Sequence, residues 1–425
     1  MLRVLFHIKK GVSLMATLQE LFGVSEAYRL PDKIMSALLS DDAEAVVRKV
    51  KDNINCDIRD MFQDEQGDRD KLKQDFTPDC ICKLVAGLTV PGNFLDMCSG
   101  TGVLGKSVVQ KNNVKIHAQE FSERTIPFAL LDACVNGITG DISRADCLRE
   151  QVFKTYQLEK HGDISVPRLS ESKKAGIYDN IVMNPPYSMK FQDADAYEIC
   201  GFTIPKSKAD YGFVLRGIEH LKEGGRLVAV LPHGVLFRGA GEGKIREWLI
   251  KEKYVNAVIG LPDKLFRNTG IPVFLLVLQK GSPDILFINS DKDFIKGSKQ
   301  NYMSDDHIKR VLDAYHSRAD VEHYAHVACY DEIESNEFNL NITRYVDTFI
   351  PEPLPDMDTI LREMKGLDKQ IQETGAELYK MLGELTGSEE DMKIVQRHRE
   401  ILRPKKEKYV LAGQMELTDF YENAM

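Results

Sequence analysis

The segment Asp-Asn-Ile-Val-Met-Asn-Pro-Pro-Tyr, residues 179–187, contains the strongest structural signal in the chain. Its apolar run at 181–183 is too short for a helix and predicts a buried parallel strand. Pro185 and Pro186 then end the strand, because proline lacks an N–H and fixes its own φ. Asn184 is therefore expected at the carboxyl end of a strand, where open α/β sheets bind their ligands.

The side chains that follow this strand suit the recognition of an amine on a planar ring. The amide oxygen of Asn184 can accept a hydrogen bond from an amino group, as can the backbone carbonyl beside it. Tyr187 offers an aromatic face that can stack on a flat ring. Together they could hold an exocyclic amine in the way that methylation of a flipped-out base requires. The alternative is an ordinary turn that ends a strand, which a Pro-Pro pair alone would favour.

A glycine-rich turn lies upstream, after another predicted strand. Phe94-Leu95-Asp96 reads as the end of a strand, and Cys98-Ser99-Gly100-Thr101-Gly102 reads as a tight turn into a helix that begins near Val103. Glycines allow a backbone to approach a ligand closely, although a lone Gly-x-Gly is equally typical of a structural turn. The acidic residues around this turn favour a binding loop.

Acidic residues also end the two strands that follow. The strand at 114–117 leads to Gln119-Glu120, and a carboxylate there can accept both ribose hydroxyls of a nucleoside cofactor. The next strand, near Asp141-Ile142, leads to Asp146, which is placed to meet the adenine edge of such a cofactor. From spacing alone, a surface aspartate is nearly as good an interpretation of Asp146.

The segment Gln74-Asp75-Phe76-Thr77-Pro78-Asp79 precedes the glycine-rich turn. Apolar residues recur with helical spacing between 81 and 88, so we expect a helix with Thr77 as its N-cap and Pro78 as its first residue. A helix start is the simple interpretation. The position just before a predicted cofactor loop favours a place in the site as well.

In the order Phe-Thr-Pro, Gly-Thr-Gly, Glu, Asp and Asn-Pro-Pro-Tyr, these motifs closely resemble those of S-adenosylmethionine-dependent adenine DNA methyltransferases. More narrowly, the chain resembles the modification (M) subunit of type I restriction–modification systems, from about residue 74 to residue 346. Long runs carry this narrower resemblance: Ser207-Lys208-Ala209-Asp210-Tyr211, Leu231-Pro232-His233-Gly234-Val235-Leu236-Phe237-Arg238-Gly239, Gly260-Leu261-Pro262, Thr269-Gly270-Ile271-Pro272 and Asn339-Leu340-Asn341-Ile342. Two departures are that Lys73 and Asp75 stand where the family usually has glycine and a second aromatic residue, and that the helical amino-terminal domain is abbreviated.

The resemblance implies that S-adenosylmethionine is the cofactor and that two sets of residues form the site. The residues implied to hold the target adenine are Asn184, Pro185, Pro186 and Tyr187. Those expected around the cofactor are Gln74, Phe76, Thr77, Pro78, Asp79, Asp96, Ser99, Gly100, Thr101, Gly102, Glu120 and Asp146. No metal is needed, because positioning supplies most of the catalysis.

The composition is that of an ordinary soluble protein. Its 425 residues are 43% hydrophobic and 28% charged, which leaves room for two or three domains with a large core. No apolar run approaches the length of a membrane span, and no convincing signal peptide follows Met1. The eight cysteines are scattered, and Cys80-Ile81-Cys82 lacks the spacing of a zinc site, so we expect reduced thiols in a cytoplasm.

The net charge of −9 argues against a chain that grips DNA alone, because Lys and Arg supply most of the nonspecific affinity for phosphates. It favours a partner that shares the DNA.

A heptad pattern in the tail consists of Met357, Ile360, Met364, Leu367, Ile371, Leu378, Met381 and Leu385, with Thr374 as the polar exception. An amphipathic helix packed on its own domain is one interpretation. The resemblance favours pairing with the specificity (S) subunit, in a complex that can also include a restriction (R) subunit.

We therefore predict an α/β fold, in which 74–300 form a Rossmann-like S-adenosylmethionine-dependent methyltransferase domain with helical flanks. Residues 1–73 are expected as short helices, 301–350 as a helical extension and 351–425 as the heptad segment. Apolar runs at 226–231, 255–259 and 274–279 complete the sheet, the last two as an antiparallel edge, and 285–288 can add a strand. His233 follows a strand but has no evident proton-relay partner, so we interpret it as structural.

The predicted function is methylation of the exocyclic amine of adenine in DNA. Methylation of a protein glutamine is an alternative, because the same motif could hold an amide. An inactive scaffold that only binds partners is another, and the intact motifs argue against it.

Overall fold

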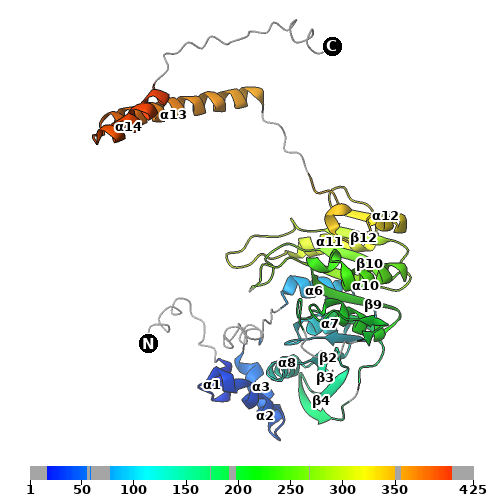
Figure 1. Ribbon diagram of the computed structural model, residues 1–425. Coiled ribbons are helices and arrows are strands. Elements are labelled where there is room, and N and C mark those ends of the chain that lie inside the picture. The colour runs from blue at the N-terminus through cyan, green and yellow to red at the C-terminus, as the bar shows by residue number, and fades with distance from the viewer. Residues whose placement is uncertain are drawn as a thin grey trace. The chain divides into compact units, whose positions relative to one another are not determined.

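The computed structural model describes residues 17–54, 58, 77–172, 174–190, 198–267, 269–349 and 356–403. The chain separates into two compact units, Met1–Phe349 and Ile350–Met425 (Figure 1). Gln74 and Phe76, two of the predicted cofactor residues, lie outside the described residues. The first unit contains the rest of the predicted site, and the second contains the heptad segment.

Among the described residues, a sheet of eleven strands has the order β13-β12-β10-β11-β9-β6-β1-β2-β3-β4-β5. Its central strands are β9 (Leu221–Pro232), β6 (Tyr178–Met183), β1 (Phe94–Met97), β2 (Ile116–Glu120) and β3 (Gly140–Asp146). These five run parallel, so their carboxyl ends lie at one edge of the sheet. The strand predicted at 181–183 is a central one, with β1 and β9 as its neighbours.

Four strands extend this parallel core on one side: β11 (Val273–Leu278), β10 (Val255–Gly260), β12 (Ile285–Asn289) and β13 (Ala325–Ala328). The predicted antiparallel pairing of β10 with β11 is confirmed. The pair is not the edge of the sheet, because β12 pairs with β10 and β13 pairs with β12. The stretch 301–350, expected to be helical, therefore also supplies a strand, which is too short to show a clear pattern in the sequence.

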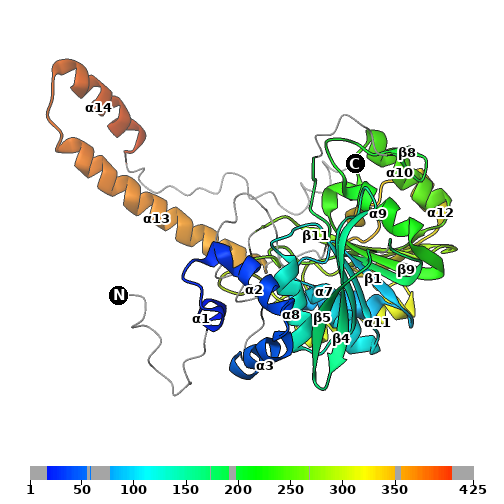
Figure 2. The ribbon, with the colours of Figure 1, turned by 90° about the horizontal axis from the view of Figure 1, so that it is seen from below.

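An antiparallel hairpin of β4 (Gln151–His161) and β5 (Ile164–Ser170) extends the other side of the sheet and was not predicted. Gly162, at a φ of 66°, closes the turn between the two strands. Helix α3 (Ala43–Asn53) lies beside β5 (Figure 2), and Arg48 and Lys51 approach the carboxylate of Asp163 at 3.2 and 2.8 Å. These ion pairs link the amino-terminal helices to the hairpin.

Helices cover both faces of the sheet, so the sheet separates two hydrophobic cores. The helices of the first core are α1 (Leu18–Phe22), α2 (Leu30–Leu38), α3, α6 (Asp79–Leu88), α7 (Val103–Asn112), α8 (Ile126–Val135) and α11 (Asp305–Ser317). Those of the second are α9 (Asp210–Glu219), α10 (Ala240–Lys251) and α12 (Tyr330–Ser335). Along β6, Val182 joins the first core, and Ile181 and Met183 join the second, as the alternation of a strand requires.

Shorter elements connect these layers: η1 (Ala27–Arg29), η2 (His233–Leu236), η3 (Ile342–Arg344), β7 (Glu198–Ile199) and β8 (Phe202–Thr203). A parallel core with helices on both faces confirms the predicted α/β class with helical flanks. Of the helices in the described part of the chain, none is long and apolar enough to cross a membrane.

The described residues of the second unit, 356–403, form two helices, α13 (Met357–Gly383) and α14 (Glu389–Ile401). The guanidinium carbon of Arg399 lies 4.5 Å from the centre of the Tyr379 ring, so α14 folds back along the end of α13. The predicted heptad residues are not covered by this contact, since Leu367 and Ile371 are 58% and 69% exposed. Leu385, the last predicted position, lies past the end of α13.

Candidate active site

The Asn-Pro-Pro-Tyr motif follows β6 at the carboxyl edge of the parallel core. The amide of Asn184 makes two hydrogen bonds there: its Nδ2 donates to Thr77 Oγ1 at 2.9 Å, and its Oδ1 accepts from the hydroxyl of Tyr187 at 2.8 Å. Because both ends of the amide are held, its orientation is fixed before any substrate binds. The carbonyl oxygen keeps a second lone pair for an incoming amine.

Tyr187 packs against a second aromatic residue. Its ring centre lies 6.1 Å from that of Phe266, with the two planes at 86°, which is a favourable edge-to-face arrangement. Pro185 is buried and Pro186 is exposed, so the motif passes from the core to the surface between these two residues. The half-buried Tyr187 ring is thus held both at its hydroxyl and by Phe266, and its orientation is well defined.

The structure corrects the role predicted for Thr77. Helix α6 begins at Asp79, and its N-cap residue is Pro78, with no hydrogen bond from a capping side chain. The buried Thr77 hydroxyl instead accepts the hydrogen bond from Asn184, which is 107 positions away in the sequence. The cap was favoured because a Thr-Pro pair is typical of a helix start. The segment before α6 therefore contacts the Asn-Pro-Pro-Tyr motif directly.

The glycine-rich turn follows β1 and is tied to the end of β2 by Glu120. The carboxylate accepts hydrogen bonds at 2.8 Å from the N–H of Gly100 on Oε2 and from the N–H of Ser122 on Oε1. Burial raises the pKa of Glu120, and these N–H donors oppose the rise. Each carboxylate oxygen keeps a further lone pair, so Glu120 can still accept hydrogen bonds from ligand hydroxyls.

Two hydroxyl groups of this turn have no hydrogen-bond partner in the described structure. They are Ser99 Oγ and Thr101 Oγ1, and both are buried, although buried polar groups nearly always pair. Gly100 and Gly102 have φ angles of 56° and 83°, and a Cβ on Gly100 would meet no atom within 4 Å. A polar ligand can therefore approach the backbone closely and pair both hydroxyls, which fits a nucleoside cofactor such as S-adenosylmethionine.

Asp96 is fully buried and contacts the helix after the turn. Its Oδ2 accepts a hydrogen bond from the N–H of Gly105 at 2.8 Å, and its Oδ1 is buried without a partner in the described structure. Loss of solvation raises the pKa of Asp96 to about 8, and the charge of Glu120 adds to the rise, while the Gly105 N–H lowers it. The contact found for Asp96 is with α7, so its contact with a cofactor stays a prediction.

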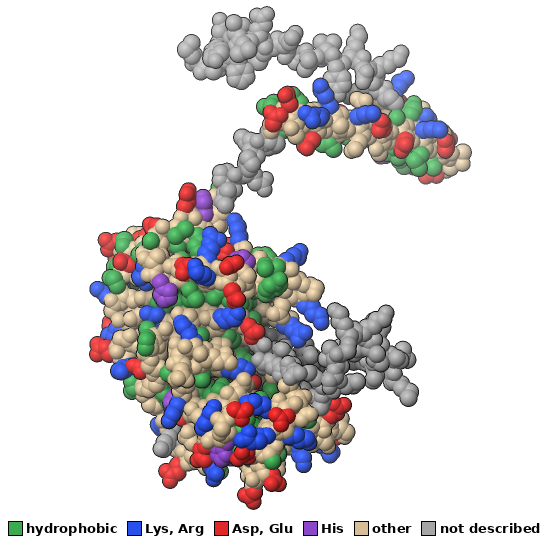
Figure 3. Space-filling view, turned by 180° about the vertical axis from the view of Figure 1, so that it is seen from behind, with side chains coloured by type: hydrophobic (Ala, Val, Ile, Leu, Met, Phe, Trp, Pro, Cys, Tyr) green, Lys and Arg blue, Asp and Glu red, His purple; other side chains and the backbone are tan. Residues whose placement is uncertain are grey.

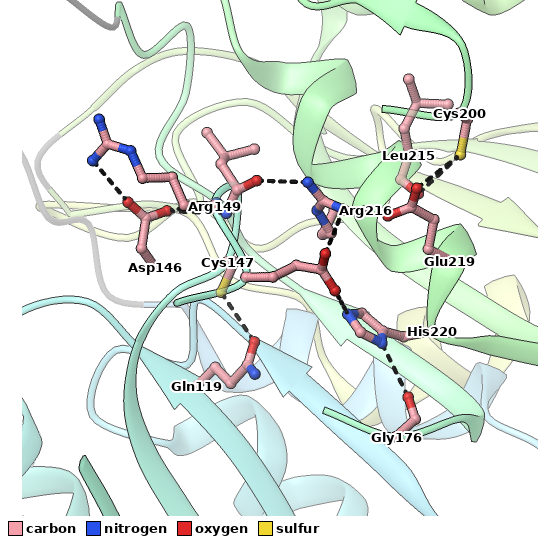
Figure 4. A network of polar contacts seen from close by, with 12 residues as sticks. Gln119, Asp146, Cys147, Arg149, Gly176, Cys200, Leu215, Arg216, Glu219 and His220 are labelled. Carbon is pink, nitrogen blue, oxygen red and sulfur yellow. Dashed lines mark hydrogen bonds and ion pairs between the residues drawn. The ribbon is translucent and has the colours of Figure 1, made fainter. Parts of the chain in front are cut away.

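Asp146 ends β3 and closes its own turn (Figure 4). Its Oδ1 accepts hydrogen bonds from the N–H groups of Leu148 and Arg149, both at 3.1 Å, and Arg149 Nη1 lies 3.3 Å from Oδ2. This geometry holds the carboxylate at the carboxyl edge, two strands from the glycine-rich turn. Contact with the adenine of a cofactor stays a prediction.

Comparisons with known proteins place these motifs in one family. The chain matches the model of the N-6 DNA Methylase family over residues 60–352. The chain belongs to the N-6 DNA methylase family. In this chain the predicted motifs, the central strand and the glycine-rich turn all fall within the matched residues.

Several relatives of this chain are methylase subunits of type I restriction enzymes. The chain is 28% identical to the MpnII subunit of Mycoplasma pneumoniae, over 70% of this chain and 59% of the relative, and 28% identical to the MjaVIII subunit of Methanocaldococcus jannaschii, over 73% and 56%. It thus spans little more than half the length of these relatives. A solved type I restriction-modification methyltransferase subunit from Streptococcus thermophilus is 31% identical, with a TM-score of 0.59 over 78% of this chain and 76% of that one. The predicted resemblance to type I modification subunits is confirmed.

Three further residues lie beside the predicted site residues and were not predicted from the sequence. Phe121 follows Glu120 directly and is 60% exposed, so the sequence could have indicated an aromatic residue beside the acid that is predicted to bind ribose. Cys147 follows Asp146, and its Sγ donates to the side chain of Gln119 at 3.3 Å (Figure 4). The contact of Phe266 with Tyr187 depends on tertiary structure and left no local pattern.

The contacts of His233 are with the backbone and with an aromatic ring of the fold. Its Nε2 lies 3.1 Å from the carbonyl of Val273, and its ring packs 5.9 Å from that of Phe274. Burial lowers the pKa of His233, although the bond to the Val273 carbonyl opposes the shift. A neutral imidazole that donates its Nε2–H to this carbonyl agrees with the structural interpretation.

Proposed function

We propose that this methylase transfers a methyl group from S-adenosylmethionine to the N6 amine of adenine in DNA, as the modification subunit of a type I restriction–modification complex. The observation that carries the proposal is the Asn184 amide, held at both ends beside the central strand β6. The family match supports an N6 amine as the target, and the methylase subunits among the relatives support the complex.

An extruded adenine would be held by its amine and by its ring. Asn184 Oδ1 and the Pro185 carbonyl would accept the two amine hydrogens, which directs the nitrogen lone pair away from both oxygens. Thr77 keeps the amide in the required orientation, because a flipped amide would direct its own NH₂ group at the amine. Tyr187 would stack on the base. These contacts orient the reacting nitrogen, and orientation can supply most of the rate enhancement.

The other half of the site would hold the cofactor. Ser99 and Thr101 offer unpaired hydroxyls, Glu120 offers lone pairs for ribose hydroxyls, and Asp146 offers a carboxylate for the adenine edge. Since β1 and β6 are adjacent parallel strands, the glycine-rich turn and Asn184 lie at one edge of the sheet. When bound, S-adenosylmethionine supplies an electrophilic methyl group.

Partners would supply the grip on DNA and the choice of site. Figure 3 shows acidic and basic side chains interspersed over one face of the first unit, and the chain carries a net charge of −9. Base recognition needs an element that enters a groove. The exposed heptad residues of α13 would pair with a specificity subunit, and a restriction subunit would complete the system.

Seven cysteines of the described chain are free thiols, which supports a cytoplasmic location.

Assembly is tested with the double variant Leu367→Asp and Ile371→Asp. It should abolish co-purification with the specificity subunit and leave cofactor binding unchanged, because it alters only the second unit. Lys369→Asp, on an exposed position between the two, is the matched control for added charge. Normal co-purification of the double variant would rule out this surface.

The reaction is tested by transfer of radiolabel from S-adenosylmethionine in the presence of the specificity subunit, DNA and candidate protein substrates. We expect label on N6 of adenine in duplex DNA. Label on a protein glutamine would show that the substrate is a protein and not DNA. Cofactor binding without any transfer would favour the interpretation of the chain as an inactive scaffold. Efficient, site-specific DNA methylation by the chain alone would refute the requirement for a partner.

A further inference from the structure

Helix α9 connects β6 to β9 on one face of the sheet and has buried polar residues near both of its ends. Asp210 is its first residue and is fully buried. Arg216, near the other end, is 9% exposed. Charged groups are expensive to bury unless they are paired, so the partners of these two side chains indicate what the helix holds in place.

The partner of Asp210 is the turn after the Asn-Pro-Pro-Tyr motif. Its Oδ1 accepts a hydrogen bond at 2.8 Å from the N–H of Ser188, the residue that follows Tyr187. Ser188 has a φ of 50°, a left-handed conformation that is uncommon for serine and needs support. The N–H of Ala209 also donates to the carbonyl of Met189 at 3.0 Å. The chain leaving Tyr187 is therefore tied to the start of α9.

The charge of Asp210 is balanced by the residues of a second motif. Arg238 donates from Nη2 to Asp210 Oδ2 at 2.8 Å. The same guanidinium donates to both oxygens of Glu242, at 2.6 and 2.7 Å. Arg238 belongs to the run at 231–239 and Asp210 to the run at 207–211, two motifs for which sequence gave no role. Their meeting point is the turn that follows the predicted base-binding residues.

Two of the partners of Arg216 lie in the turn after Asp146, and a third, Glu219, is the last residue of α9. Its Nη2 donates to the carbonyl of Leu148 at 2.7 Å, and its Nη1 approaches Glu150 Oε2 at 3.1 Å and also contacts Glu219. The N–H of the same Leu148 donates to Asp146. Figure 4 shows Arg216 between this turn and the end of α9. The guanidinium thus fixes the segment whose first residue is predicted to meet the cofactor.

We propose that α9 positions both halves of the active site, Asp210 through Ser188 on the side of the target base and Arg216 through Leu148 and Glu150 on the side of the cofactor. The proposal rests on the proposed function for the identity of the two ligands. The contacts given above join both residues to protein segments that flank the predicted site, so both are proposed as positioning residues. A helix that only stabilised the fold would affect both halves alike, whereas two separate anchors predict two separate defects.

The test compares Asp210→Ala with Arg216→Ala in the full chain. Asp210→Ala should lower kcat for DNA methylation in the complex with the specificity subunit on the order of 10-fold to 100-fold, because the base is misplaced. Its Kd for S-adenosylmethionine should match that of wild type. Arg216→Ala should raise that Kd about ten-fold, for the loss of its hydrogen bonds, and spare kcat at saturating cofactor.

Conservative variants and a control separate positioning from stability. Asp210→Asn keeps an oxygen for the Ser188 N–H and should recover part of kcat. Arg216→Lys keeps the positive charge but loses the planar guanidinium with its several N–H donors. It should recover part of the cofactor affinity. If an alanine variant does not fold, Asp210→Asn and Arg216→Lys test the two positioning roles with smaller expected effects. Asp293→Ala is the matched control, because Asp293 is a buried carboxylate that accepts from Arg310 at 2.9 Å, in the loop after β12 and outside the site.

Hydrogen exchange supplies a readout that does not depend on the reaction. Asp210→Ala should speed exchange in the peptide 184–190 and Arg216→Ala in the peptide 146–150. Parallel loss of kcat and cofactor affinity in both variants, or a loss of stability alone as in Asp293→Ala, would overturn the proposal. A wild-type chain that binds cofactor but does not methylate DNA in the complex with the specificity subunit would instead refute the proposed function, and the exchange pattern would still decide the role of α9.

Discussion

The two halves of the candidate site differ in how their polar groups are satisfied. On the base side, the amide of Asn184 is bonded at both ends by other side chains of the motif segments. On the cofactor side, the hydroxyls of Ser99 and Thr101 are buried without partners in the described structure. The first arrangement holds its shape without a ligand, and the second lacks groups that a ligand can supply.

This difference predicts where substitutions will act. A preorganised group contributes chiefly to the orientation of the reacting atom, so its loss should lower kcat. A group that is completed by a ligand contributes to binding, so its loss should raise a Kd. Substitutions on the two sides of the edge formed by β1 and β6 should therefore separate in kinetic measurements.

The largest effect is expected for Asn184→Ala. Loss of the amide removes one acceptor for the adenine amine and leaves the hydroxyls of Thr77 and Tyr187 without their partner. We expect kcat to fall by at least about 100-fold, while cofactor binding and the fold stay close to wild type. Asn289→Ala, at the carboxyl end of β12, is the matched control. Turnover near the wild-type value would sink the assignment.

Glu120→Ala should act on the other side of the comparison. The variant loses hydrogen bonds to ligand hydroxyls and also releases the N–H of Gly100. Each lost charge-assisted bond is worth about 1.5–3 kcal/mol, so calorimetry of the full chain should show clearly weaker binding of S-adenosylmethionine. Glu123→Ala, on an exposed carboxylate three residues later, should bind normally. If Glu120→Ala binds S-adenosylmethionine with unchanged affinity, Glu120 is not part of the cofactor site. The proposed difference between the two halves would then be wrong.

The fold could be predicted largely because its strands carry continuous apolar runs. The run at 181–183 marked a central parallel strand, and its Pro-Pro pair marked where that strand ends. The β4–β5 hairpin escaped notice because Lys154, Glu159 and Lys160 interrupt the apolar residues, and β13 is only four residues long. Such strands owe their pairing to neighbours in the sheet and show little of it in their own sequence.

The site was predictable at the level of motifs but not of contacts. Residues predicted to bind one ligand lie at one edge because parallel strands bring their carboxyl ends together. The bond between Thr77 and Asn184 joins two segments that sequence assigned to different ligands. Asp210 and Arg216 were equally hidden, since a local pattern does not show which distant backbone a buried charge will support.

Thr77→Val should have a moderate effect that sharpens the comparison. The substitution keeps the shape of the side chain but removes the acceptor for Asn184 Nδ2, so the amide loses its fixed orientation. One neutral hydrogen bond is worth about 0.5–1.5 kcal/mol, which corresponds to a loss of up to roughly ten-fold in kcat. Thr77→Ser keeps the hydroxyl and should stay near wild type. A raised Kd for the cofactor with an unchanged kcat would instead assign Thr77 to the cofactor side alone.

The smallest effect on turnover is expected for Asp96→Asn, which changes instead how stability depends on pH. The folded pKa of Asp96 is raised to about 8, chiefly by loss of solvation, whereas an unfolded aspartate titrates near about 3.9. Between these values the folded chain binds more protons than the unfolded chain, so the free energy of unfolding falls as pH rises from about 4 to about 8. One proton sets the upper limit of this slope at about 1.4 kcal/mol per pH unit. Urea unfolding followed by fluorescence of Trp248, the single tryptophan of the chain, should show the slope in wild type and its loss in Asp96→Asn. The asparagine keeps an acceptor for the Gly105 N–H. The free energy of unfolding of Asp96→Asn should therefore rise relative to that of wild type as the pH approaches 8. Parallel stability curves for the two proteins would mean that Asp96 is ionised in the fold, and that the cofactor half tolerates a buried charge there.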